Sequence, residues 1–359
     1  MNKVAFQGIG SFLPEEVRTN DWWPDRVVTE WTKTALDSRP RIEDAIASAP
    51  TQGQRAVLEA MLGVQADPFR GVRQRRVMDA RMESSGMEVE AARRAIQAAG
   101  VRPDEIDVLL THSMVPDDIG IPNSVVVHDK LGLGDHCLTT TVEGTCNSFL
   151  MQVALAEQLI ASGRARHALL VQSCALSRIM DYADPQSAWF GDGATAEVIG
   201  ASQGAAGILG RSTMTESRLR NAVAIGRAGS KWYEAPGRLG MVSPDRKSGY
   251  QILLGFADYG KRVVDAALSD AGLSSSDVTF FGCHQAQIWQ RRVAQRYCGL
   301  DAARALDTFD WAGNLTSANL PLVLEVAQRG GVLRDGDVVA LYGGGAGVTV
   351  SGLIAKWGR

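Results

Sequence analysis

Apolar residues recur along the chain in two alternating periods, which predict helices and strands in turn. Between Ser84 and Gly100 they return every three or four residues, as in an amphipathic helix, and the short apolar strand Val108–Leu110 follows. The same order recurs later, where a periodic stretch ends at Gly272 and the strand Val278–Phe281 follows. A glycine directly after the last periodic residue is a common helix C-cap. This alternation predicts an α/β fold with mostly parallel or mixed buried sheets.

The repetition extends to the residues themselves. Residues 99–112 read AGVRPDEIDVLLTH, and the fourteen residues that begin 172 positions later (271 minus 99) read AGLSSSDVTFFGCH. The periodic helix that opens at Cys146 precedes the strand-like HALLVQSC, and the one that opens at Asn314 precedes DVVALYGGG. We therefore expect two equivalent halves, 1–200 and 201–359, packed as one body. A chance repetition of βα units in a large α/β protein is the alternative.

Residues 32–69 do not fit this symmetry. They contain two polar-to-amphipathic stretches, among them QRAVLEAMLGV at 54–64, and such patterns are typical of helices. We expect a helical insertion in the first half. The sequence leaves open whether it is a lid over a site or packs on the outside.

The composition fits a globular protein and removes several classes of function. Of 359 residues, 45% are hydrophobic and 21% charged, which excludes disorder, collagen and coiled coils. The 37 basic and 40 acidic residues give a net charge of −3, so we expect no nucleic-acid or membrane-surface binding. Neither a membrane-spanning apolar stretch nor a signal-peptide core is found, so a cytoplasmic location is expected.

The positions of cysteine and glycine exclude several kinds of site. The five cysteines include no CxxC pair, so neither a disulfide framework nor a zinc site is predicted. Glycine is enriched, at 38 residues, but Gly8-Ile-Gly10 lacks the third glycine of a dinucleotide-binding loop. The run Gly343–Gly347 lacks the Lys-Ser/Thr of a phosphate-binding loop, although its backbone N–H groups are suited to an oxyanion.

Cys146, His284 and Asn314 are the candidates for chemistry. Cys146 lies at the predicted start of a helix, where free backbone N–H groups and the helix dipole favour the nucleophilic thiolate. An inert thiol, a structural histidine and a helix N-cap are the ordinary alternatives at these three positions. Cys146 and Asn314, however, occupy corresponding helix ends of the two halves, and His284 a corresponding strand end. Halves that face each other would bring all three to one place.

The segments around these residues resemble the β-ketoacyl-acyl-carrier-protein synthase III family, condensing enzymes with the thiolase fold. The family's order is followed by GIGSFLPEEVRTN at the start, VEGTCNSF at Cys146, FGDGATA at 190–196, HQA at His284 and GN…SA…PL at Asn314. The resemblance covers nearly the whole chain apart from 32–69. It implies a thiolase-like α/β fold, with duplicated βαβαβ halves in a five-layer αβαβα arrangement.

The resemblance also implies a role for each candidate. Cys146 would attack an acyl thioester and hold the acyl group. The oxyanion hole would consist of the backbone N–H of Cys146 and that of Ala346, or of Gly345 if the alignment shifts by one residue. His284 and Asn314 would bind the carbonyl of a malonyl-type thioester and stabilise the carbanion that decarboxylation leaves. No metal or redox cofactor is implied, and the substrates would arrive on coenzyme A or on an acyl carrier protein. A homodimer is implied as well.

Four further positions are expected at the substrate entrance. Trp31 aligns with a tryptophan that stacks on adenine, and Arg70, in RGVRQRR, resembles a coenzyme-contacting residue, with plain surface charge as the alternative. Trp289 stands where a basic residue typically helps to dock the carrier protein. Ile121 lies in the partner-facing loop that borders the family's acyl channel. Together with the insertion, these departures indicate a non-standard acyl substrate.

Three functions are compatible with these patterns. The leading one is a cytoplasmic, homodimeric condensing enzyme of fatty-acid-like or polyketide biosynthesis, which joins an acyl thioester to a malonyl-type thioester with loss of carbon dioxide. The alternative keeps the acyl-cysteine but transfers the acyl group to a hydroxyl or an amine. The retained His284 and Asn314 favour carbon–carbon bond formation. With Cys146 intact, an inactive accessory subunit is disfavoured.

Overall fold

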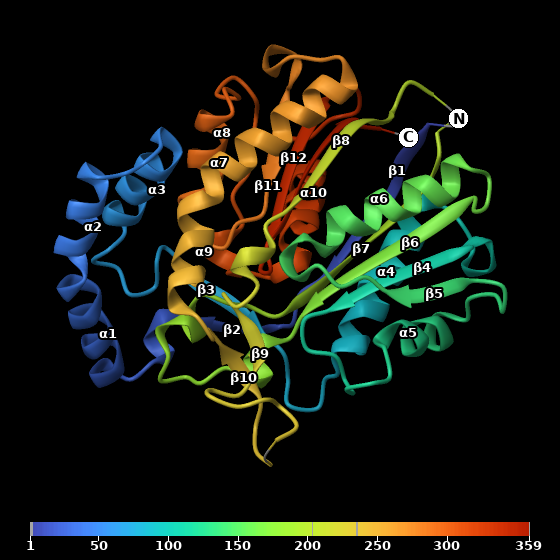
Figure 1. Ribbon diagram of the computed structural model, residues 1–359. Coiled ribbons are helices and arrows are strands. Elements are labelled where there is room, and N and C mark those ends of the chain that lie inside the picture. Colours follow the sequence, from blue (N-terminus) through green and yellow to red (C-terminus); the bar gives the residue numbers. More distant parts are fainter. Residues whose placement is uncertain (1–2, 203, 235, 359) are drawn as a thin grey trace.

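Two mixed β-sheets form the centre of the molecule in the computed structural model, which describes residues 3–202, 204–234 and 236–358 (Figure 1). The first sheet contains, in spatial order, β1 (Val4–Phe12), β7 (Gly193–Ala201), β6 (His167–Cys174), β4 (Val108–Ser113) and β5 (Leu138–Thr141). The second contains β8 (Gly207–Thr215), β13 (Thr349–Lys356), β12 (Val338–Gly345) and β11 (Phe280–Cys283).

The two sheets repeat one topology. Counted from β1 in the first sheet and from β8 in the second, the first two strand pairs are antiparallel and the third pair is parallel. β5 extends the first sheet by one more parallel strand, whereas a single parallel bridge between Phe280 and Arg304 takes the matching place in the second. The predicted α/β fold with mixed sheets is confirmed. The chain passes from one sheet to the other between β7 and β8.

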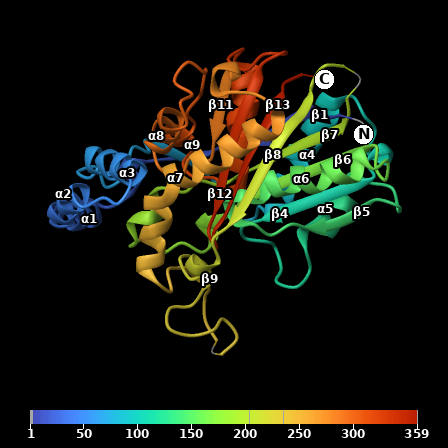
Figure 2. The same cartoon turned by 45° about the horizontal axis from the view of Figure 1, so that its top comes forward.

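Helices lie between the sheets and on both outer faces, which gives five layers (Figure 2). They are α4 (Ser84–Ala99), α5 (Asn123–Leu131), α6 (Ser148–Ala161), α7 (Arg246–Ala271), α8 (Gln290–Tyr297) and α10 (Asn319–Arg329). α6 and α10 form the middle layer, and their buried residues join apolar side chains of both sheets in one core. α4 and α5 cover the outer face of the first sheet, and α7 and α8 that of the second.

In each sheet, a glycine in one strand lets a helix pack unusually close to that strand. A Cβ at Gly8 of β1 would lie 2.3 Å from the carbonyl oxygen of Ala95 in α4. A Cβ at Gly210 of β8 would lie 2.4 Å from the carbonyl oxygen of Ala267 in α7. Ala95 and Ala267 are 172 positions apart (267 minus 95), which is the offset of the sequence repeat. Only glycine permits this approach of helix to strand, so the repeat is present in the packing as well.

Three helices occupy the segment expected as an insertion, and they begin at Asp25 rather than at residue 32. They are α1 (Asp25–Asp37), α2 (Arg39–Ala47) and α3 (Gln52–Gly63). Val57 of α3 is buried in the core of the second half, and Thr51 Oγ1 donates to Asp258 Oδ2 of α7 at 2.6 Å. A helical insertion is therefore confirmed, and α3 packs on the outside of the second half.

Two short sheets of two strands each and a one-turn helix complete the fold. β2 (Glu16–Thr19) pairs with β3 (Gln74–Val77), and β9 (Ala224–Gly226) with β10 (Gly240–Val242); α9 is Phe309–Ala312. Within the described ranges, every helix is too short or too polar to cross a membrane.

Candidate active site

Cys146 lies in a 3₁₀ turn, Thr145–Asn147, that leads directly into α6. The preceding Thr145 is held in the left-handed region (φ 49°), and its N–H donates to Glu143 Oε1 at 3.0 Å. Ser148 Oγ closes the turn, because it accepts from Gly144 N–H and donates to the carbonyl of Thr145, each at 2.8 Å. The predicted position of the cysteine at a helix N-terminus is confirmed.

His284 and Asn314 reach the same place from the second half. His284 directly follows β11, and its N–H donates to the carbonyl of Tyr342 in β12 at 2.9 Å. Asn314 lies before the 3₁₀ turn Thr316–Ala318 that leads into α10, and its Oδ1 accepts from Thr316 N–H at 2.8 Å. This contact fixes the amide so that Nδ2, a donor, is left for a ligand. Both residues line one cavity with Cys146.

The turn between β12 and β13 lies against the cysteine turn. Gly345 and Ala346 line the cavity, and Thr145 Oγ1 donates to the carbonyl of Ala346 at 3.2 Å. A Cβ at Gly345 would lie 2.2 Å from the carbonyl oxygen of Gly144, so only glycine fits there. The expected oxyanion residues are thus next to Cys146, and hydrogen bonding of their N–H groups to a substrate remains a prediction.

Burial dominates the electrostatics of the site. It raises the pKa of the Cys146 thiol to about 12, and the Glu143 carboxylate adds to the rise. The prediction of a stabilised thiolate is therefore wrong for this conformation, because the helix N-terminus does not offset the loss of hydration. Burial also lowers the pKa of His284 to about 4, so its imidazole is neutral at pH 7.

Alkylation of Cys146 by iodoacetamide is expected to accelerate about tenfold per pH unit from neutrality to about pH 10, without a plateau. Only the thiolate reacts, and with a pKa of about 12 its fraction keeps rising over this whole range. The rate can be followed by intact mass spectrometry in a Cys137→Ala background, because Cys137 is the other thiol with exposed surface. A plateau below about pH 9 would contradict the high pKa.

The cavity has a volume of about 730 Å³, within the range of small-molecule sites. Its lining combines polar side chains, among them Cys146, His284 and Asn314, with many apolar ones. The apolar wall comes from both halves, from the segments after β4 and β6 as well as from β9, β10, α7 and the second sheet. Its apolar residues include Met114, Leu176, Phe190, Val223, Ile225, Met241, Ile252, Leu253, Phe256, Val348 and Val350. Such a wall suits a hydrocarbon chain.

Two of the four expected entrance residues, Trp31 and Trp289, are enclosed by the protein. Trp31 is 7% exposed, packs among other aromatic rings, and donates from Nε1 to the carbonyl of Ala183 at 2.8 Å, so its ring is enclosed rather than open to adenine. Trp289 is 6% exposed and packs edge-on against Phe256 in the core, so it presents no docking surface.

Arg70 and Ile121 keep part of their exposure. Arg70 Nη1 donates to the carbonyl of Val64 at 3.1 Å and to Gln65 Oε1 at 2.9 Å, so the chain itself uses this guanidinium. Burial lowers the pKa of Arg70, and Asp67 acts against it. Ile121 is 58% exposed, as a residue that faces a partner requires. None of the residues of the insertion lines the cavity as the structure describes it, so the lid role is not supported.

The structure corrects the register of the repeat. Thr145 and Thr316 are the matching residues, because both have a left-handed φ (49° and 53°) and each opens the 3₁₀ turn before a middle-layer helix. Their offset of 171 makes Ser317, not Asn314, the counterpart of Cys146.

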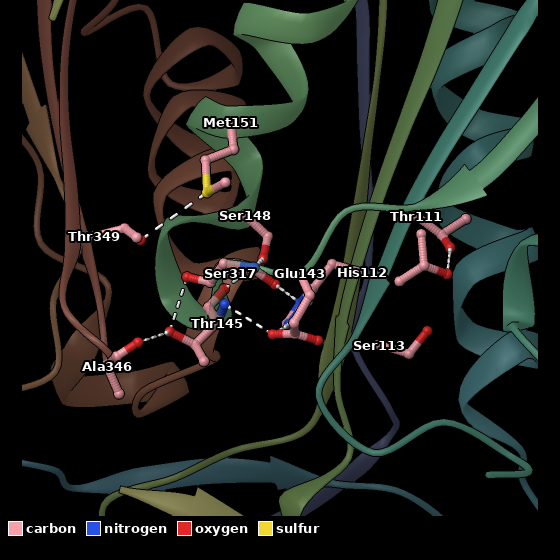
Figure 3. A network of polar contacts seen from close by, with 12 residues as sticks. Thr111, His112, Ser113, Glu143, Thr145, Ser148, Met151, Ser317, Ala346 and Thr349 are labelled. Carbon is pink, nitrogen blue, oxygen red and sulfur yellow. Dashed lines mark hydrogen bonds and ion pairs between the residues drawn. The ribbon is translucent and has the colours of Figure 1, made fainter. Parts of the chain in front are cut away.

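Two further residues of the site were not singled out from the sequence. In this register Asn314 corresponds to Glu143, and His284 to His112. Figure 3 shows Glu143 beside His112. Both counterparts line the cavity. The sequence did contain a signal for His112, because it ends the first repeated segment as His284 ends the second.

Comparison with known proteins gives consistent matches. Residues 141–217 match the family described as 3-oxoacyl-[acyl-carrier-protein] synthase III, and residues 268–357 match its C-terminal part. The chain is 32% identical to the beta-ketoacyl-[acyl-carrier-protein] synthase III of Rhizorhabdus wittichii, over 78% of this chain and 86% of the relative. It is 29% identical to the protein of that name from Erythrobacter litoralis, over 99% and 100% of the two chains.

Solved structures agree on the architecture. A 3-oxoacyl-(acyl carrier protein) synthase III from Pseudomonas aeruginosa superposes with a TM-score of 0.77 at 25% identity, over 99% of both chains. OleA from Xanthomonas campestris, solved with lauric acid and lauroyl-CoA, superposes with a TM-score of 0.74 at 20% identity, over 99% of both chains. At that identity the second likeness shows the fold, which is thiolase-like.

Proposed function

Because the chain belongs to the 3-oxoacyl-[acyl-carrier-protein] synthase III family of condensing enzymes, we propose that it forms an acyl-enzyme on Cys146 and joins the acyl group to a malonyl-type thioester with loss of carbon dioxide. The observation that carries the proposal is the convergence of Cys146, His284 and Asn314 on one cavity, although they come from different halves of the chain.

In the first step, Cys146 Sγ attacks the carbonyl carbon of the acyl thioester. A new carbon–sulfur bond forms, the old one breaks, and the thiol proton goes to the departing carrier thiol. The tetrahedral oxyanion is stabilised by the N–H of Cys146 and an N–H of the Gly345–Gly347 turn. The neutral His284, with a pKa of about 4, is a poor acceptor for the thiol proton, so the proton moves between the two sulfurs through solvent.

In the second step, the malonyl thioester carbonyl accepts hydrogen bonds from Asn314 Nδ2 and the imidazole of His284. His284 and Asn314 both line the cavity that contains Cys146, which supports this assignment. The bond between the α-carbon and the carboxylate breaks, carbon dioxide leaves, and the electron pair forms an enolate. Its carbon attacks the acyl carbonyl, a carbon–carbon bond forms, and the carbon–sulfur bond to Cys146 breaks. The Cys146 thiolate that leaves takes up a proton from solvent.

The apolar wall supports an acyl group with a hydrocarbon chain as the first substrate, and the lauric acid in the Xanthomonas campestris OleA structure is of this class. The proposed reaction balances without a metal or redox cofactor, since both substrates are thioesters. Coenzyme A and an acyl carrier protein are the proposed carriers. All five cysteines are free thiols, which agrees with the proposal that the enzyme functions in the reducing cytoplasm.

The test uses the purified chain with acyl-CoA substrates from acetyl to lauroyl. We expect an acyl adduct in the intact mass and, after addition of malonyl-CoA or malonyl carrier protein, release of carbon dioxide with a β-ketoacyl product. An adduct without carbon dioxide release, and with the acyl group passed to an added alcohol or amine, would replace condensation by simple transfer. No adduct across the panel would overturn both.

We also propose a homodimer built on the edge of the first sheet. β5 is an edge strand of that sheet, so a second copy could pair with its free side, and the apolar Leu138 at its start is 53% exposed. Sedimentation is expected to give twice the mass of the chain, and Leu138→Lys should shift the protein toward the monomer. A monomer at micromolar concentration in the unchanged protein would refute the dimer.

A further inference from the structure

Each catalytic residue has a counterpart in the other half of the chain. His112, Glu143 and Ser317 correspond to His284, Asn314 and Cys146 at offsets of 172, 171 and 171. The local geometry is also repeated: Thr145 N–H donates to Glu143 Oε1 at 3.0 Å, as Thr316 N–H donates to Asn314 Oδ1 at 2.8 Å. The cavity therefore receives a neutral amide from one half and a carboxylate from the other.

The cluster of His112, Glu143 and Ser317 is not a second nucleophilic site. His112 Nδ1 lies 2.6 Å from Ser317 Oγ and its Nε2 lies 3.2 Å from Glu143 Oε1, an order that resembles a serine–histidine–acid chain (Figure 3). Ser317, however, is 0% exposed and does not line the cavity, so no substrate reaches its hydroxyl. What the cluster does is hold Glu143 in place through a buried histidine.

Glu143 lines the cavity and is held by one of its two carboxylate oxygens. Both hydrogen bonds, from His112 and from Thr145 N–H, go to Oε1, and Oε2 has no hydrogen-bond partner among the residues that the structure describes. Burial acts to raise the pKa of Glu143, but these hydrogen bonds outweigh it and keep the pKa below its usual value, so the carboxylate is charged at neutral pH.

The carboxylate lies close to the nucleophile. Glu143 is three residues before Cys146 in the same turn, both line the cavity, and the negative charge contributes to the raised pKa of the thiol. Arg246, at the start of α7, is the other side chain with a permanent charge in the described lining. The acyl group that Cys146 accepts is thus placed beside a fixed anion.

We propose that Glu143 selects the acyl group by charge, so that thioesters carrying a carboxylate are rejected from Cys146 and remain available as the carbon nucleophile. The inference rests on the proposed acylation of Cys146. A malonyl-type thioester and a hydrocarbon acyl thioester share the same carrier and the same cavity. Repulsion from Glu143 gives the enzyme a physical means to load the hydrocarbon acyl group first, because like charges that line one cavity oppose each other. The Glu143 side chain is 67% exposed, so water screens part of this repulsion.

The experiment compares two acyl-CoA substrates that differ only in charge. Succinyl-CoA ends in a carboxylate and succinamoyl-CoA in a carboxamide of nearly the same shape. Acylation rates of Cys146 are measured by intact mass. In the unchanged enzyme, succinamoyl-CoA should react at least about tenfold faster than succinyl-CoA, and the ratio should fall toward one in Glu143→Gln. Because the ratio is taken within each enzyme, a change in the pKa of Cys146 cancels.

Two control variants complete the design. Glu15→Gln removes one exposed carboxylate outside the cavity and should leave the ratio unchanged. Glu143→Asp keeps the charge and should keep most of the selectivity. A ratio that is the same in Glu143→Gln as in the unchanged enzyme would overturn the inference. Acylation by succinamoyl-CoA in both enzymes would still support the proposed function, so the two failures are distinguishable.

Discussion

Replacement of Cys146 by alanine is expected to abolish acyl-enzyme formation and to lower condensation on the order of 10⁴-fold or more, because Cys146 is the one thiol among the described residues that line the cavity. The measurement is intact mass after incubation with an acyl-CoA, together with product formation after addition of malonyl thioester. Sγ is half-buried at the start of α6, so its removal creates little empty volume and the fold should be kept.

Cys137→Ala is the matched control. Cys137 is a half-buried free thiol like Cys146, but it lies before β5 and does not line the cavity. Its replacement should leave both the adduct and the product at the level of the unchanged enzyme. An acyl adduct that persists in Cys146→Ala and disappears in Cys137→Ala would show that the nucleophile has been misidentified.

Replacement of Asn314 by alanine is expected to separate the two half-reactions. Acylation of Cys146 should continue, because the first thioester uses the oxyanion donors of the cysteine turn and the Gly345–Gly347 turn. Decarboxylation and condensation should fall about 10²–10³-fold, the usual effect of removing one donor to a developing oxyanion. Carbon dioxide release from labelled malonyl thioester, measured on the preformed acyl-enzyme, gives the rate directly.

A second substitution separates donation from local structure. Asn314→Asp keeps an oxygen that can accept from Thr316 N–H, and so keeps the turn before α10, but it removes the Nδ2 donor. We expect it to fold like the unchanged protein and to lose condensation as Asn314→Ala does. Full condensation activity in either variant would remove Asn314 from the catalytic role.

The sequence predicted the site better than its surroundings. Cys146, His284 and Asn314 each stand at the junction of a strand or loop with a helix, and the repeat placed those junctions in equivalent halves. The motif order then assigned their roles. The same alternation predicted an α/β fold with mixed sheets, and the resemblance implied the five layers, whereas the strand order became known only from the structure.

Predictions failed where they depended on what packs beside a residue. Trp31 and Trp289 have the right positions along the chain, but aromatic neighbours enclose both, and no local pattern reports such neighbours. The thiolate expected at Cys146 failed for the same reason. The start of a helix can be read from the sequence, whereas the desolvation that outweighs it is a property of the whole cavity. Glu143 was missed because the repeat register was three residues off, which only the paired left-handed turns reveal.

The covalent joining of the two halves has a consequence for how the site can change over generations. Had two separate copies of one half formed the cavity, every substitution would have entered both sides at once, and an amide opposite a carboxylate could not arise. In a single chain, positions 143 and 314 are encoded separately. In the proposed mechanism, position 314 can keep the amide that carbon–carbon bond formation uses while position 143 changes with the substrate. Mutation could then alter substrate preference without altering the chemistry.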